Sequence, residues 1–296
     1  MHRYMRAIGF SSFESRKKLQ ELLAEVVMHP DRRAYAMGQE GRILGEFCKD
    51  FAKRMGVAVC GEFDEDERFT FEYYFPYLEG CGITSYEDIS VERHADKESY
   101  AGVCDDYKVG ISLIFYLNNK IPYVKEQAAN RLPIHGTTLT LSALSINGTI
   151  MLSIQKDKEQ LERVKQVLAN RSSLMAAARK GDEAAIETLT LKDMDMYTIV
   201  SKRIQKEDIF SLVDTYFMPY GVECDHYSIL GEIVGMQQVT NQMTGELINV
   251  LTICCNDLTF DVCINKEDLY GEPQIGRRFK GTIWLQGKIN MQDLSQ

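Results

Sequence analysis

The chain has 296 residues, of which 45% are hydrophobic and 26% charged, values ordinary for a globular protein with room for more than one core. Its formal net charge of −9 argues against a general nucleic-acid binder, which needs excess cations to displace counterions from phosphates. No apolar run approaches the roughly 20 residues that cross a bilayer, and none follows Met1 as a secretory signal would. The eight cysteines form no CxxC pair. We therefore expect a cytoplasmic protein with reduced thiols and no membrane contact.

An amphipathic helix is the first element predicted within residues 1–155, which we expect to form a mixed α+β domain with an antiparallel sheet. Ser11 and Glu14 have the spacing of a capping box, and leucine and valine then recur at helical intervals. The helix should end near His29, because the proline that follows disfavours helical backbone in the residue before it.

Strands are predicted through much of the rest of this domain. Residues 33–80 alternate as a group of strands, although 40–55 also fit a helical period, and there we favour a helix. Two strands at 99–106 and 109–117 and a short helix at 120–131 should follow.

A hairpin is predicted at the end of the domain. Leu139–Ile146 and Thr149–Ile154 both alternate, and Asn147 and Gly148 stand between them. Asn-Gly is the strongest two-residue hairpin signal, since a type I′ turn requires positive φ at both central positions.

The remaining chain divides into a helical and a strand-rich part. Residues 156–213 have a helical period, no proline and one glycine, and Asp182 is placed to cap a helix at 182–189. Residues 214–296 predict a long bent strand, two meander strands, a helical insert and a closing strand, the order of an OB-like barrel. The expected fold class is α+β: an N-terminal mixed α/β domain, a helical connector and a C-terminal OB-like antiparallel β-barrel.

The closing strand, residues 278–289, has the most informative pattern. It alternates, so one face should fill the barrel with Phe279, Ile283, Leu285 and Ile289. The opposite face is the candidate binding site and contains the residues that we call the cationic strip, Arg278, Lys280, Trp284, Gln286 and Lys288.

Three interpretations of the cationic strip remain open. The connector or the N-terminal domain could cover Trp284 within the chain. A protein partner, including a second copy of the chain, could bind there, because Trp and Arg are favoured at interfaces. Single-stranded nucleic acid or another anion could stack and pair there, although residues 214–296 hold five Lys/Arg against eleven Asp/Glu, a net charge of −6 that disfavours it. A bulge at Gly281 would reverse the two faces.

Sequence motifs of catalysis and metal binding are not evident. P-loop, GxGxxG, HExxH and GxSxG patterns do not occur, and no nucleophile has a base at a recognisable spacing. Cys224 and His226 are the nearest approach to a metal pair, and His94 is the histidine most suited to titrate near neutral pH. We therefore expect no catalytic residues, no metal and no cofactor.

Three segments carry a family resemblance: MHRYMRAIGF at the start, FMPYGVECDHYSILGEI at 217–233 and the run CNDLTFDVCINKEDLYGEPQIGRRFKGTIWLQGKIN at 255–290. With these the chain resembles an uncharacterised domain-of-unknown-function family of anaerobic Gram-positive bacteria, over nearly its full length. The resemblance implies a bacterial cytoplasmic setting and no particular mechanism. The expected function is a non-enzymatic intracellular binding or scaffold role through the cationic strip. The alternatives are nucleic-acid or anion binding by the barrel, or an enzyme whose site is assembled between the domains.

Overall fold

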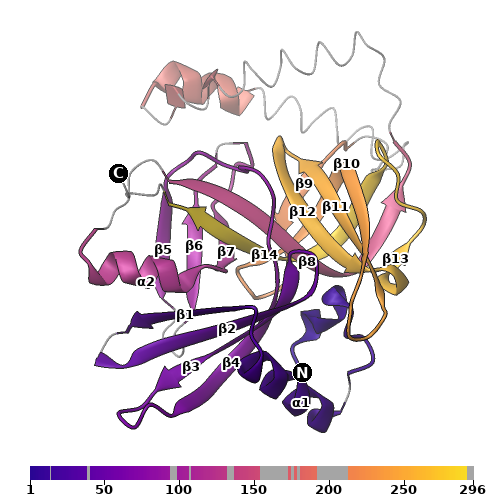
Figure 1. Cartoon of the computed structure of the whole chain (residues 1–296). Helices are drawn as coiled ribbons and strands as arrows, with labels where there is room; N and C mark the ends of the chain where they lie inside the picture. Colours follow the sequence, from indigo (N-terminus) through magenta and orange to yellow (C-terminus); the bar gives the residue numbers. More distant parts are fainter. Residues whose placement is uncertain are drawn as a thin grey trace.

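In a computed structural model, the described part of the protein is mixed α and β, with many strands and few helices (Figure 1). The structure describes residues 1–13, 15–38, 41–93, 99–106, 108–131, 137–153, 173–174, 177–178, 181–191 and 213–291. Most of the expected connector, and His94, lie outside these residues. Inside the connector, a helix at 183–191 begins after Asp182, whose carboxylate accepts from the backbone N–H groups of Ala184 and Ala185 at 3.1 and 3.2 Å, so this cap is confirmed.

The chain begins with a 3₁₀ helix, η1 (Arg3–Ile8), and the amphipathic helix α1 (Arg16–Met28). The predicted end of α1 at His29 is confirmed. The predicted start is wrong, because Ser15 is the N-cap residue. Ser11 instead donates from its backbone N–H and its hydroxyl to the carboxylate of Glu246, at 3.2 and 2.9 Å.

A four-stranded antiparallel sheet follows, with the strands in chain order. Its strands are β1 (Arg32–Met37), β2 (Ile43–Ala52), β3 (Met55–Phe63) and β4 (Phe69–Leu78). The helix predicted at 40–55 is wrong, since β2 pairs along its length with β1 and β3. Both faces of β2 are packed, with Leu44 in one core and Phe47 and Phe51 in the other, and two buried faces hide the alternation that marks a strand.

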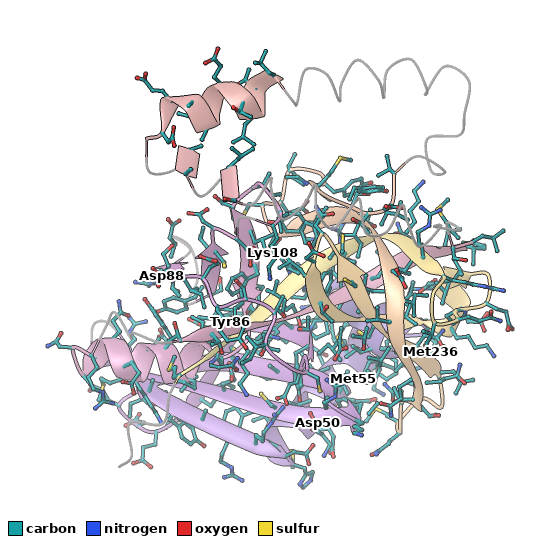
Figure 2. All side chains as sticks on the ribbon, turned by 90° about the horizontal axis from the view of Figure 1, so that it is seen from above. Asp50, Met55, Tyr86, Asp88, Lys108 and Met236 are labelled. Carbon is teal, nitrogen blue, oxygen red and sulfur yellow. The ribbon has the colours of Figure 1, made fainter. Side chains whose placement is uncertain are left out.

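A ten-stranded sheet is the second sheet of the described structure, and part of it closes into a barrel. Its strands are β5 (Ile89–Arg93), β6 (Tyr100–Cys104), β7 (Leu113–Leu117), β8 (Thr138–Met151), β9 (Tyr216–Pro219), β10 (His226–Thr240), β11 (Leu247–Cys255), β12 (Leu258–Asn265), β13 (Leu269–Tyr270) and β14 (Arg278–Asn290). The short helices are α2 (Lys120–Ala128), after β7, and η3 (Lys266–Asp268), after β12. Figure 2 gives the view from above, with Asp50 of the four-stranded sheet and Met236 of the barrel labelled.

The barrel closes in the order β8, β12, β11, β10, β14 and back to β8. Residues 214–296 therefore do not complete the barrel alone, because β8 comes from the first half of the chain. The barrel is also not wholly antiparallel, since β8 and β12 run parallel. The strands predicted at 247–255 and 278–289 are confirmed by β11 and β14.

The hairpin predicted around Asn147 and Gly148 is wrong. Both residues lie inside β8, a continuous strand of 14 residues that pairs with β14 from Arg278 to Asn290. A register shift between Thr282 and Ile283 absorbs an extra residue there, and the Asn147 side chain accepts from the Thr282 backbone N–H at 3.0 Å. The long ladder with β14 prevails over the local turn preference, which concerns only two residues.

Gly148→Val should strongly destabilise the fold, for a packing reason and not for positive φ. A Cβ at Gly148 would lie 2.4 Å from a ring carbon of Phe279 and 2.9 Å from the Ile264 side chain, both in the barrel core. We expect a loss of about 1–3 kcal/mol or more, as for overpacked cores, measured by urea denaturation. Gly245→Ala, where no atom lies within 4 Å, controls for the loss of a glycine, although its positive φ will cost some stability. An unchanged midpoint for Gly148→Val would contradict the pairing of β8 with β14.

Candidate functional site

The cationic strip does not form one open surface. The alternation of β14 is confirmed, and its apolar face lies in the barrel core. On the other face Trp284 is 4% exposed, and its ring lies 4.8 Å from His2, 5.4 Å from Tyr4 and 5.2 Å from Tyr116, between ring centroids. Its indole N–H donates to Asp225 at 2.7 Å. The interpretation in which the N-terminal part covers Trp284 is confirmed.

The other members of the strip are divided among different environments. Arg278 is buried and donates to the carbonyls of Leu152 and Val213 at 3.1 and 2.9 Å. Gln286 is fully buried and joins the barrel to β4, donating to the Pro76 carbonyl at 2.8 Å. Lys280 is half-buried and Lys288 exposed. The expectation of a single exposed binding strip is therefore wrong, since packing of the N-terminal elements on β14 covers its centre.

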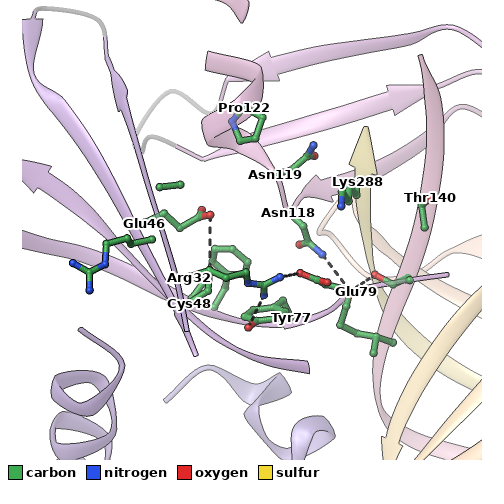
Figure 3. Close-up of a pocket in the computed structure, with 17 residues that line it drawn as sticks. Arg32, Glu46, Cys48, Tyr77, Glu79, Asn118, Asn119, Pro122, Thr140 and Lys288 are labelled. Atoms are coloured by element: carbon green, nitrogen blue, oxygen red, sulfur yellow. Dashed lines mark hydrogen bonds and ion pairs between the residues drawn. The ribbon is translucent and has the colours of Figure 1, made fainter. Parts of the chain in front are cut away.

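Lys288 reaches instead the rim of a cavity between the four-stranded sheet and the barrel (Figure 3). The cavity has a volume of about 240 Å³ and is bounded by β1 to β4, the start of α2, β8 and β14. Its apolar lining residues include Ala34, Ala58, Phe75, Leu78 and Pro122. Its polar lining residues include Arg32, Arg33, Glu46, Cys48, Glu79, Asn118, Asn119, Thr140, Ser142 and Lys288.

Glu46 is the most unusual lining residue. It lies on β2 and is only 7% exposed. Its carboxyl accepts from two thiols, those of Cys48 at 3.9 Å and Cys60 at 3.8 Å, which are weak donors. Desolvation by burial raises the pKa of Glu46, and the nearby charges of Lys120 and Arg32 offset this only in part. Burial also raises the pKa of Cys60, to about 12, so that this thiol stays protonated.

Arg32 and Glu79 form an ion pair at one side of the cavity. The Arg32 guanidinium also donates to the Tyr77 hydroxyl at 3.0 Å and approaches Asp50 at 3.4 Å. The charge of Arg32 is therefore neutralised by these carboxylates, and the sheet holds its side chain in place.

The barrel side of the cavity presents two asparagines. Asn119 is committed to Ile289 of β14, donating to its carbonyl at 2.8 Å and accepting from its N–H at 3.1 Å. Asn118 donates to Leu78 and Gln286 at 3.4 and 3.2 Å, whereas its carbonyl oxygen is buried and has no hydrogen-bond partner among the described residues. Asn118 thus offers a buried acceptor.

A second polar cluster covers Trp284. Asp225 accepts from Trp284 and lies 2.8 Å from the Nδ1 of His226. His2 packs on the indole, and burial together with the charge of Arg3 lowers its pKa to about 4. No three His, Cys, Asp or Glu residues converge as metal ligands within the part of the chain that the structure describes, so Cys224 and His226 gain no third ligand there.

The titration of His2 should make the free energy of unfolding depend on pH. Its folded pKa lies below the ordinary 6.5, so protons bind the unfolded chain more readily between pH 6.5 and about 4. Stability should therefore fall as pH falls through this window, by up to about 3 kcal/mol from His2. Urea denaturation at pH 7 and pH 4.5 measures it, and His2→Gln should show a smaller fall than the unmodified chain. An equal fall in both proteins would contradict the half-buried, neutral state of His2.

Sequence reasoning missed the cavity residues Arg32, Glu46, Glu79 and Asn118. They belong to no short motif, and the only available signal was a glutamate within the apolar run around 43–52.

Among the described residues, no helix is both long and apolar enough to cross a membrane.

Comparison with known proteins places the chain in a family. Neither the curated proteins nor the solved structures contain a significant match. A family model with the description "Domain of unknown function, E. rectale Gene description (DUF3881)" matches residues 5–287, from the middle of η1 to near the end of β14. The match covers nearly the whole chain, and the chain therefore belongs to this family of unknown function.

Proposed function

We propose that the protein has a non-enzymatic binding role, and that a small organic molecule lies in the cavity between the four-stranded sheet and the barrel. The observation that carries the proposal is Glu46, a buried carboxyl that faces this cavity and whose only hydrogen-bond donors among the described residues are two thiols. Burying such a group without strong hydrogen bonds is unfavourable. Its retention at a cavity wall is explained if a ligand supplies the missing partner.

The size of the cavity restricts the ligand to a metabolite of modest size. A cavity of roughly 150 Å³ accommodates benzene, so about 240 Å³ accommodates a molecule moderately larger than one aromatic ring. The lining combines apolar walls with a few placed polar groups, as small-molecule sites do.

The barrel supports an OB-like interpretation in which β8 acts as the fifth strand. β10 is long and has a register shift between Ile233 and Gly235, β11 and β12 form a meander, η3 follows, and β14 closes towards β8. Nucleic-acid binding along β14 is less well supported, because Arg278 binds backbone carbonyls and Trp284 is covered. A protein partner or a second copy would need a different surface.

Filling the cavity tests the proposal. The full chain, purified gently from a native lysate, should carry a small molecule detectable by native mass spectrometry. Ala34→Phe, which projects a ring into the cavity, should lose it, while Met37→Leu, at an exposed position of the same strand, should retain it. If Ala34→Phe folds normally and retains the same molecule as the unmodified chain, the ligand lies elsewhere and the proposal is wrong.

A further inference from the structure

The polar groups of the cavity differ between its buried part and its rim. Two acceptors lie deep: the Glu46 carboxyl and the buried carbonyl oxygen of Asn118. Figure 3 shows Glu46 on the sheet side, and Asn118 and Lys288 on the side opposite it. Both deep groups can accept hydrogen bonds from a ligand, because within the described structure thiols are the only hydrogen-bond donors to Glu46 and the Asn118 oxygen has no donor.

The rim of the cavity, in contrast, presents positively charged side chains. Arg33 and Lys288 line it, both exposed, and neither forms an ion pair with another described residue. Arg32 is already neutralised by Glu79. The rim therefore offers two cations, which favour an anionic group at the solvent side of a ligand.

From this polarity we infer that the cavity binds an α-amino acid with an apolar side chain, its ammonium group directed towards Glu46 and Asn118 and its carboxylate towards Arg33 and Lys288. An ammonium group has three donors and no acceptor, which suits two deep acceptors. The side chain packs on the apolar walls, notably Phe75 and Pro122. The volume of about 240 Å³ suits residues such as leucine, methionine or phenylalanine.

The electrostatics of Glu46 agree with this inference. Desolvation by burial raises the pKa of Glu46, and the charges of Lys120 on α2 and Arg32 on β1 offset this rise only in part. The other titratable groups that face the carboxyl are the thiols of Cys48 and Cys60. A bound ammonium group would stabilise the carboxylate, so binding should release a proton and affinity should rise with pH through the Glu46 titration. A ligand with only a carboxylate would require protonated Glu46 as a donor, and its affinity would fall with pH.

The inference rests on the proposed small-molecule role, and isothermal titration calorimetry of the full chain tests the two separately. The probes are L-leucine, L-methionine and L-phenylalanine, with isocaproate and isoamylamine as leucine analogues that lack the ammonium or the carboxylate group. At least one amino acid should bind. For leucine, both analogues should bind about tenfold or more weakly, since each loses a charged hydrogen-bonding group.

Glu46→Gln preserves the shape of the side chain and removes its charge. We expect amino-acid affinity to fall about 10- to 100-fold in this variant and its pH dependence to disappear. Glu62→Gln, on the same sheet but paired with Arg42 away from the cavity, should bind as the unmodified chain does. Unfolding midpoints at pH 7 show whether each variant is folded.

The outcomes separate the two proposals. If isocaproate binds as well as leucine, or Glu46→Gln binds leucine unchanged, the ammonium assignment is wrong. If no amino acid binds although Ala34→Phe abolishes retention of a co-purified molecule, the ligand class is wrong and the small-molecule role stands. If Ala34→Phe folds and binds leucine normally, both proposals are wrong.

Discussion

Trp284→Ala should lower the free energy of unfolding of the full chain by about 3–5 kcal/mol, in the range for truncating a large buried aromatic side chain. The indole is 4% exposed and packs among the rings of His2, Tyr4 and Tyr116. Truncation would also leave the Asp225 carboxylate without its indole donor. Urea denaturation followed by far-UV circular dichroism measures the change, and Phe279→Ala in the barrel core should cost a similar amount.

Two variants make this expectation specific. Tyr270→Ala removes an aromatic ring that is 73% exposed on β13 and should change stability by less than about 0.5 kcal/mol. Trp284→Phe preserves most of the ring packing and loses the hydrogen bond to Asp225, so it should fall between the two. A loss below about 1 kcal/mol for Trp284→Ala would show that η1 and β7 do not cover the indole in solution.

A fragment of residues 214–296 should fail to fold on its own. β8 lies outside this fragment, and it pairs with β14 from Arg278 to Asn290 on one side and with β12 on the other. Without β8 the barrel has two unpaired strand edges and an opened core, and such edges promote aggregation. We expect poor amide dispersion in a proton–nitrogen correlation spectrum, and no cooperative unfolding transition.

Supplying β8 in trans is the matched control. Residues 1–155 expressed together with 214–296 as a separate chain should restore dispersion and co-purify as a complex, because β8 pairs with β12 and β14 and η1 packs against β8 and β12. A well-dispersed spectrum and a cooperative transition from 214–296 alone would contradict the closure of the barrel by β8.

The positions of several strands in the C-terminal half follow from the sequence by itself. Alternation with a period of two marks β11 and β14, and the Asn256-Asp257 turn between β11 and β12 has positive φ at both residues. The end of α1 at His29 and the cap at Asp182 are similarly local. These features depend on residues close together in the chain, so the pattern alone is sufficient to predict them.

Only the tertiary structure decided the features that concern function. Asn147 and Gly148 have a strong turn preference, yet their segment is one strand because β14 provides a partner for its whole length. Trp284 has the position of a surface residue in a barrel, yet η1, more than 270 residues before it, covers it. Glu46, Asn118 and Lys288 line the same cavity only because the four-stranded sheet packs against the barrel. Each of these outcomes depends on contacts between distant segments, and such contacts leave no spacing signal in a single sequence.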